Sequence, residues 1–388
     1  MSVNTMSFED AAAILNNIRK QVTGESAIAP LTTADFVSVA TTVLNAGYEP
    51  VLAAITQMVS STIFSIRPYY RKFGGIKMDQ EQWGAIVRKL SIADKDFEVD
   101  DRYSLVDGQS IDMYKVNKPN VLQTNYYGFT HWSKTMTTFR DQLDSAFSGP
   151  GEFGRFMAMV TQNIADMIEQ SFESVARMTI GNFIGGKYAA GADVIHLLTE
   201  YNTEVGGTYT ATTIMQPANF PNFVKWMYAR VGTLTGLMTE RSQKFQLNVT
   251  GKEISRHTPY EMQKVYLYSK FLNDMDARVL ADTFNYNFLK FADVEAVNYW
   301  QSIDTPDEIQ VTPSYIDSTG AVVTAAAQTI SKVIGVIFDQ DALGYTVVHK
   351  WTATSPFNIR GGYYNTNWVY DCRWYNDFTE KGIVLLLD

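Results

Sequence analysis

Cysteine is almost absent from this chain, since Cys372 is the only one among 388 residues. A single cysteine excludes a disulfide within the chain and favours a protein made in a reducing, cytosolic environment. Because Cys372 lies within an aromatic segment, its surroundings should raise the pKa of the thiol, which argues against a thiol nucleophile. Cysteine chemistry is therefore not expected.

Histidine is also scarce, and no two histidines form an HxH or HxxxH pair. A zinc or iron site would need ligands brought together over long distances in the sequence, so we expect no metal and no cofactor. The four are His131, His196, His257 and His349.

The chain also lacks a secretory signal, a membrane span and a basic excess. Its first residues contain neither a basic region nor an apolar core. The best apolar stretch, 51–66, is too short to span a bilayer. The formal net charge of −9 gives no general attraction to DNA or to anionic membranes. These absences predict a soluble intracellular protein that does not read nucleic acid.

A glycine-rich motif, Gly149-Pro-Gly-Glu-Phe-Gly154, fits the G-x-G-x-x-G fingerprint of dinucleotide-binding proteins. Its context does not fit, because the preceding run 137–147 has helical spacing rather than the pattern of a buried strand. Pro150 also removes an N–H group that would face a pyrophosphate. We interpret the motif as a glycine hinge before a helix.

Acidic motifs give equally weak signals. The segment from Asp339 begins like a calcium loop, but Leu343 and Lys350 stand where oxygen ligands are needed. The pairs Asp94/Asp96 and Asp100/Asp101 fall in a polar stretch and are interpreted as a solvated or intersubunit face. The sequence therefore assigns no catalytic, cofactor-binding or metal-binding residue, which favours a structural role.

Helical spacing dominates the first 65 residues and the middle of the chain. Helices are expected from Ser7 to Gly24, from Thr32 or Thr33 to Gly47, and over 50–61. A fourth apolar stripe runs over 153–183 and stops before Gly185-Gly186. A helix over this range would be about 45 Å long. It would be far longer than the mean helix of about 11–12 residues.

Between these helical regions, a polar segment predicts a long hairpin. Strand-like runs over 83–90 and 121–131 flank turn signals at Asp107-Gly108 and Lys118-Pro-Asn120. A hairpin with so little apolar surface of its own needs a partner surface.

The region 190–328 is mixed. It predicts strands over 205–213 and 245–249 and helices over 220–238 and 255–263.

The end of the chain has the clearest strand pattern. Tyr364, Thr366, Trp368, Tyr370, Cys372 and Trp374 alternate with polar positions, as on a half-buried antiparallel strand. An apolar strand, 382–387, closes the sequence.

The order of these parts resembles the major capsid proteins of tailed bacteriophages with the Hong Kong 97 fold. The resemblance is carried by the segment Ile334–Tyr345, by the final strands, by the long helix after the hairpin, and by the run Tyr266–Asn285. It implies an α+β fold with an extended hairpin loop and a long spine helix, from a short-tailed phage. The implied parts are an N-terminal helical arm (1–65), the extended loop (66–135), a peripheral domain with the spine helix (136–190), an axial domain (191–328) and a peripheral C-terminal sheet (329–388).

What the resemblance implies about function is an icosahedral shell around a double-stranded DNA genome, built from hexamers and pentamers. The implied partners are other copies of the chain, a scaffolding protein, a portal protein and decoration or head-fibre proteins, with packaged DNA touched weakly and no membrane. Assembly is expected in the host cytoplasm, with maturation from a procapsid and a final place in the virion.

The covalent crosslink of some relatives needs a lysine on the hairpin, and the sequence does not single one out. The candidates are Lys77, Lys89, Lys95, Lys115 and Lys118. Two alternative functions remain open: an encapsulin-type compartment that holds a cargo enzyme, and a soluble nucleotide-binding enzyme that uses Gly149 to Gly154.

Overall fold

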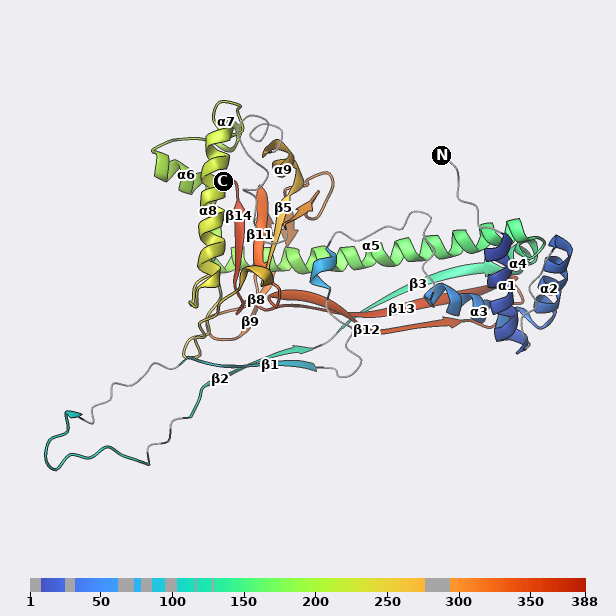
Figure 1. Ribbon diagram of the computed structural model, residues 1–388, viewed down its shortest axis with the longest axis horizontal. Helices are drawn as coiled ribbons and strands as arrows, with labels where there is room; N and C mark the ends of the chain where they lie inside the picture. Colours follow the sequence, from blue (N-terminus) through green and yellow to red (C-terminus); the bar gives the residue numbers. More distant parts are fainter. Residues whose placement is uncertain are drawn as a thin grey trace.

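The computed structural model describes residues 8–24, 32–61, 73–77, 86–94, 103–114, 116, 118–127, 129–275 and 294–388. The molecule is elongated along helix α5 (Pro150–Ala190), with helices α1–α3 at one end and a five-stranded sheet at the other. A two-stranded hairpin projects from the body (Figure 1). The long helix therefore sets the axis of the protein.

The N-terminal helices agree with the sequence prediction. They are α1 (Phe8–Thr23), α2 (Thr33–Asn45) and α3 (Tyr48–Ser61). The Thr32 hydroxyl accepts a hydrogen bond from Asp35 N, and the Asp35 carboxylate accepts one from Thr32 N, so a capping box starts α2. Their apolar faces pack on the start of α5, where the Phe36 and Phe153 ring centroids are 5.8 Å apart.

Helix α5 is longer than predicted: its 41 residues extend about 60 Å. The predicted stop before Gly185-Gly186 is wrong, because the helix continues to Gly191, whose φ of +64° ends it. The two glycines permit close packing instead. A Cβ at Gly185 would lie 2.4 Å from Val311 Cγ1, and one at Gly186 would lie 2.4 Å from Phe378 Cζ.

A long three-stranded antiparallel sheet runs beside α5, in the order β12–β13–β3. Its strands are β12 (Leu343–Thr354), β13 (Tyr363–Asn376) and β3 (Thr130–Phe139). The predicted alternation is confirmed in the first half of β13, where Tyr364, Thr366 and Trp368 are buried and Asn365 and Asn367 are partly exposed. Further along β13, the opposite face is buried as well, at Val369, Asp371 and Arg373.

Only the last part of the predicted helix 137–147 is helical. Residues up to Phe139 belong to β3, and helix α4 spans Arg140–Ala146. Pairing of β3 with β13, for example Thr138 with Tyr364, holds the earlier residues in the sheet.

The second sheet has the order β4–β14–β11–β5–β6. Its strands are β4 (Val194–His196), β14 (Gly382–Leu386), β11 (Val333–Asp339), β5 (Gln263–Tyr268) and β6 (Val294–Val297). Helices α6 (Leu197–Val205), α8 (Phe220–Thr239) and α9 (Ser269–Met275) contribute to the core on this sheet. The expected boundary at residue 329 does not coincide with a break in this sheet, since β11 and β14 pair with strands from the preceding segment.

Three predictions in the mixed region are wrong, and one is confirmed. Helix α8 matches the predicted 220–238. The Thr-rich run 205–213 is not a strand: α6 ends at Gly206, and Thr210 caps the short helix α7 (Ala211–Ile214).

Residues 245–249 form no strand, because the Gln246 side chain bonds to Asn248 and to the Ile254 carbonyl, which stabilises a loop. Over 255–263, a backbone bridge from Arg256 to Ser242 and then Pro259 leave only the short turn η3 (Tyr260–Met262) helical.

Short elements complete the described chain. They are η1 (Gly74–Ile76) and two small antiparallel pairs, β7 (Ile309–Val311) with β10 (Gln328–Ile330) and β8 (Ser314–Ile316) with β9 (Val322–Thr324). The last part of the run Tyr266–Asn285 lies outside the described residues.

The predicted hairpin is confirmed as β1 (Ile86–Ile92) paired antiparallel with β2 (Val121–Tyr127), with Ile92 opposite Val121. The predicted second strand, 121–131, is divided between β2 and β3, which belong to different sheets.

Candidate functional site: the extended loop and its charged root

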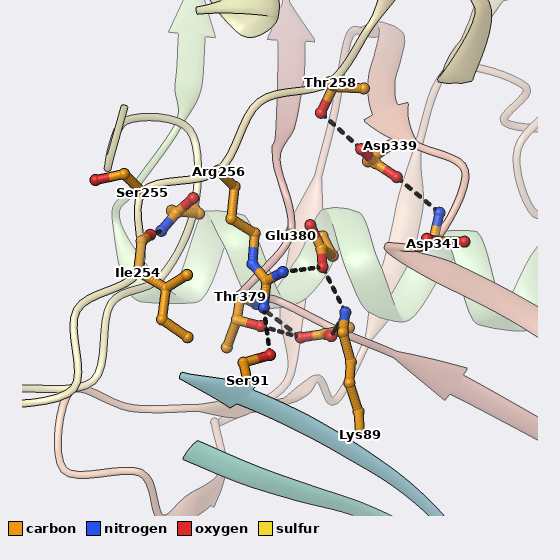
Figure 2. A network of polar contacts seen from close by, with 12 residues as sticks. Lys89, Ser91, Ile254, Ser255, Arg256, Thr258, Asp339, Asp341, Thr379 and Glu380 are labelled. Atoms are coloured by element: carbon orange, nitrogen blue, oxygen red, sulfur yellow. Dashed lines mark hydrogen bonds and ion pairs between the residues drawn. The ribbon is translucent and has the colours of Figure 1, made fainter. Parts of the chain in front are cut away.

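The glycine-rich motif and the calcium-loop-like motif both occupy structural positions. Gly149 precedes α5, Pro150 is its first residue, and a helix rather than a strand comes before them. Asp339 ends β11 and accepts hydrogen bonds from Thr258 Oγ1 (2.7 Å) and from the backbone N of Asp341 (2.9 Å) (Figure 2). A turn of this kind uses the carboxylate oxygens that a calcium ion would need.

Two of the histidines lie near each other, because His131 and His349 both pair with Asp371 in the long sheet and both rings lie against Phe129. His131 Nδ1 lies 2.6 Å from Asp371, and His196 Nδ1 lies 2.6 Å from Asp388. Across the described ranges, no group of three or more His, Cys, Asp or Glu side chains is placed to hold a metal ion. Cys372 is buried, and burial raises the pKa of its thiol to about 11.

The extended loop is defined here as β1, β2 and the chain between them (86–127), and its strand β1 has an inverted pattern of burial. Lys89 and Ser91 face the body and are partly buried, whereas Leu90 and Ile92 are 67% and 65% exposed. Val121, which pairs with Ile92, is also exposed on this outer face. The outer face thus exposes these three apolar side chains beside the polar Arg88, Gln123 and Asn125. Exposed apolar side chains gathered on one face are typical of a surface that another molecule covers.

Exposed apolar side chains continue toward the end of the extended loop. A two-stranded hairpin is marginally stable alone, so a partner surface that covered these side chains would stabilise it. Beyond the paired strands they are Tyr103, Leu105, Val106, Ile111, Met113, Tyr114 and Val116.

Four charged side chains fix the hairpin to the body, and we call them the charged root: Lys89, Arg256, Asp377 and Glu380. Lys89 Nζ lies 2.5 Å from Asp377 Oδ2 and 2.5 Å from Glu380 Oε1. Arg256 Nη1 lies 2.8 Å from Glu380 Oε1, and its Nη2 donates to Ser91 Oγ at 3.1 Å. Figure 2 shows Arg256 and Lys89 on two sides of Glu380. Two cations and two anions thus join β1 to the segment that carries Arg256 and to the segment that carries Asp377 and Glu380.

The acids of the charged root come from the turn between β13 and β14. Asp377 N donates to the Ala342 carbonyl at 2.6 Å, and the Asp377 carboxylate accepts hydrogen bonds from Thr379 N and Thr379 Oγ1. Arg256 is positioned by its backbone bridge to Ser242. These hydrogen bonds hold the Asp377 carboxylate in place independently of Lys89.

Burial makes these charges interdependent. The Asp377 side chain is fully buried, and those of Glu380, Arg256 and Lys89 are 9%, 17% and 28% exposed. Burial alone would lower the pKa of Lys89, but the charges of Asp377 and Glu380 outweigh it and raise that pKa.

The pKa values of the two acids are shifted in opposite directions. Burial opposes ionisation of Asp377, yet Lys89 and the Thr379 hydrogen bonds hold the Asp377 pKa below its usual value. Burial raises the pKa of Glu380, despite the nearby Lys89 and Arg256. Glu380 is therefore the member of the charged root that takes up a proton first as pH falls.

A second contact holds the loop just beyond β1. The Asp94 carboxylate accepts hydrogen bonds from Arg241 Nη2 (2.6 Å) and from the backbone N of Ser255 (2.5 Å). Asp94 N in turn donates to the Glu253 carbonyl at 2.9 Å. Asp94 is thus a local anchor; the other acids of the predicted acidic pairs, Asp96, Asp100 and Asp101, lie outside the described residues.

The structure separates the candidate lysines of the hairpin. Lys89 is paired with acids of its own chain, whereas Lys77 and Lys118 are exposed, and Lys95 and Lys115 lie outside the described residues. The sequence did not distinguish Lys89, since its partners lie almost 300 positions further on. The only sequence signal was its place in a strand whose alternate residues are apolar.

Comparison with known proteins first defines the fold. A chain from the capsid structure of Staphylococcus phage Andhra aligns with a TM-score of 0.56 and 12% identity, over 84% of this chain and 86% of that one. A chain from a structure of the head fibre and inner core protein gp22 of native bacteriophage P68 aligns with a TM-score of 0.57 and 12% identity, over 84% and 87%. The chain has the Hong Kong 97-like fold of phage capsid proteins.

The family follows from sequence. A family model described as the Phi29-like phage major capsid protein matches residues 14–375, nearly the whole chain. The chain therefore belongs to that family, and it is a major capsid protein of a tailed phage, a structural component of the virion. Curated protein sequences gave no match. None of the helices in the described part of the chain is long and apolar enough to cross a bilayer.

Proposed function

We propose that copies of this chain join as hexamers and pentamers into an icosahedral shell around double-stranded DNA. The observation that carries the proposal is the extended loop, whose outer face exposes Leu90, Ile92 and Val121 while its inner face is tied to the body by charges. A neighbouring subunit that covers this face would bury apolar area worth about 25 cal/mol per Å². The charged root would keep the loop at a fixed angle to receive that neighbour.

The division of the chain into arm, loop, peripheral domain and axial domain is part of the proposal. Sheet pairing supports one change to the boundaries expected from sequence. Strands β11 and β14 would belong to the axial domain with β4, β5 and β6, whereas β12 and β13 would stay with the spine helix.

The remaining roles rest on the family. The proposed partners are a scaffolding protein, a portal protein and head-fibre or decoration proteins, with assembly in the host cytoplasm followed by maturation from a procapsid. The net charge of −9 supports only weak contact with packaged DNA. We propose no enzymatic activity. The family match favours a phage shell over a cargo compartment or a nucleotide-binding enzyme.

Electron microscopy of the purified protein, with size-exclusion chromatography and addition of a scaffolding protein, tests the proposal. Closed shells or rings of five and six are expected. A protein that stays monomeric with scaffold at all concentrations, or that binds NAD or ATP tightly, would contradict it.

A further inference from the structure

A turn near the middle of the extended loop contains the only Asp-Gly or Asn-Gly pair of the chain, Asp107-Gly108. The Gln109 backbone N donates to the Val106 carbonyl at 2.9 Å, and Val106 N donates to the Gln109 side-chain oxygen at 3.2 Å. These two bonds close the turn on both sides of the pair. Residues 103–114 are exposed throughout, and the loop projects away from the body (Figure 1).

The turn leaves the Asp107 carboxylate and the Gly108 amide free. Within the residues that the structure describes, neither group makes a hydrogen bond or an ion pair. Gly108 has a φ of +87°, and a Cβ built on it would meet nothing within 4 Å. Because glycine has no side chain, its amide nitrogen is open to approach by the neighbouring carboxyl group. The turn therefore places an unrestrained carboxyl group beside an unshielded amide.

Two other aspartates that precede a small residue are held in place. Asp317, which a serine follows, accepts hydrogen bonds from the backbone N of Thr319 at 2.9 Å and of Ala321 at 3.0 Å. Asp144, also before a serine, accepts from the Tyr48 hydroxyl at 2.7 Å and lies within helix α4. Attack by the next amide requires the backbone beside the aspartate to rotate, which a helix or a bonded carboxylate resists. The structure thus distinguishes Asp107 from these two.

We propose that Asp107-Gly108 is a site of spontaneous isomerisation to isoaspartate in subunits that have not assembled. The Gly108 nitrogen attacks Cγ of Asp107, and the new N–Cγ bond closes a succinimide ring. One carboxyl oxygen leaves as water, with the amide proton and a proton from solvent. Water then adds to the ring and breaks one of its two C–N bonds. When the bond to the main-chain carbonyl breaks, the backbone runs through Cβ and Cγ; no oxidant or reductant takes part.

The product alters the turn. The backbone path becomes longer by one carbon, and the main-chain carbonyl of Asp107 becomes a free carboxylate. The bond between Val106 and Gln109 then cannot keep its geometry, and the exposed side chains of Leu105 and Val106 move with it. This consequence rests on the proposed function, in which a neighbouring subunit covers the extended loop. Isomerised subunits therefore assemble less well, and assembly protects the subunits that have joined a shell.

Incubation of the unassembled protein at physiological temperature for several weeks tests the chemical step. The probe is a methyltransferase specific for isoaspartate, used with labelled S-adenosylmethionine, and peptide mapping locates the label. The peptide with Asp107 should divide into two forms of equal mass, one of them labelled, and the peptides with Asp144 and Asp317 should stay unlabelled. An unlabelled Asp107 peptide, or equal labelling at Asp317, would overturn the inference.

Two variants separate isomerisation at this pair from other causes of labelling. Asp107→Glu keeps the charge but would need a larger ring, so its label should be lost. Asp107→Asn forms the same ring by release of ammonia and should gain label several-fold faster than the wild type. Both changes lie at an exposed turn, where substitutions leave the fold intact. Label on Asp107→Glu equal to that of the wild type would overturn the assignment.

Assembly of partly isomerised protein tests the consequence. Isoaspartate should be depleted several-fold in shells relative to the protein left unassembled, and equal amounts in the two fractions would overturn the effect on assembly. The chemical step is measured on the unassembled chain, so failure of the fresh wild type to form shells would count against the proposed function alone.

Discussion

Lys89 and Asp377 are separated by 288 positions in the sequence, yet the lysine Nζ and the carboxylate Oδ2 lie 2.5 Å apart. The contact joins the first strand of the extended loop to the turn before the last strand. Because Asp377 is fully buried, it depends on this lysine for charge compensation.

Lys89→Met should therefore destabilise the unassembled protein by about 3 kcal/mol, near the low end for breaking a buried ion pair, since Lys89 keeps some exposure. The measurement is the urea midpoint of unfolding. Lys118→Met is the control, because Lys118 is an exposed lysine of the same loop. Equal midpoints for the two variants would show that the charged root adds no stability.

Acidification should change the contributions of the two acids of the charged root to folding stability in opposite directions. The Glu380 pKa is raised above its ordinary value of 4.5, so the folded state binds a proton more readily than the unfolded state. This contribution to stability is fully present below pH 4.5 and is lost as pH rises through the folded pKa. Relative to Glu380→Gln, the wild type should gain stability as pH falls from neutral toward 4.5.

The stability that Asp377 contributes should depend on pH in the opposite way, because the Asp377 pKa is lowered below 3.8. Its contribution is present above pH 3.8 and is lost as pH falls through the folded pKa. Relative to Asp377→Asn, the wild type should lose stability in that acid range. Urea midpoints over a pH series measure both trends, and parallel trends for the two variants would contradict the assignment.

Gly186→Ala should destabilise the protein by about 1–2 kcal/mol through overpacking, even though alanine favours a helix by up to about 1 kcal/mol. The added Cβ would meet Phe378, whose ring is buried and stacks on Phe183 at 5.4 Å. Gly232→Ala in α8 meets nothing within 4 Å and should stabilise instead. Thermal or urea unfolding compares the two, and a stabilising Gly186→Ala would mean that Phe378 moves aside freely.

Replacing Leu90 and Ile92 together by threonine should leave the unassembled protein within about 0.5 kcal/mol of the wild type, as for most surface changes. Shell formation should fall sharply, because the covered apolar area is lost. Ile303→Thr, at an exposed site outside the extended loop, is the control. Light scattering during assembly gives the measurement, and unchanged kinetics would remove the outer face from the proposed interface.

The sequence predicted elements that follow from local pattern. The stripe from Phe153 to Phe183 indicated a long helix, and the alternation from Tyr364 to Trp374 indicated a half-buried strand; both are present. The resemblance to phage capsid proteins rested on the order of such elements, and the family match confirms it.

Some failures arise because distant contacts override local preference. Gly185 and Gly186 were interpreted as a helix end, but Val311 and Phe378 require their small size within the helix. The charged root could not be predicted, since nothing near Lys89 in the sequence identifies Asp377 or Glu380 as its partner. Local patterns in a single sequence carry no information about which distant residues will form such a pair.

The spine helix also has a mechanical consequence. Phe153 near its start packs with the N-terminal helices, and Phe183 near its end packs against Phe338 and Phe378 by the second sheet. Because the helix is rigid and is packed at both ends, a small rotation imposed at one end displaces the elements packed at the other end. Any change in curvature of the shell would thus be transmitted through each subunit as a rigid tilt rather than absorbed by local bending.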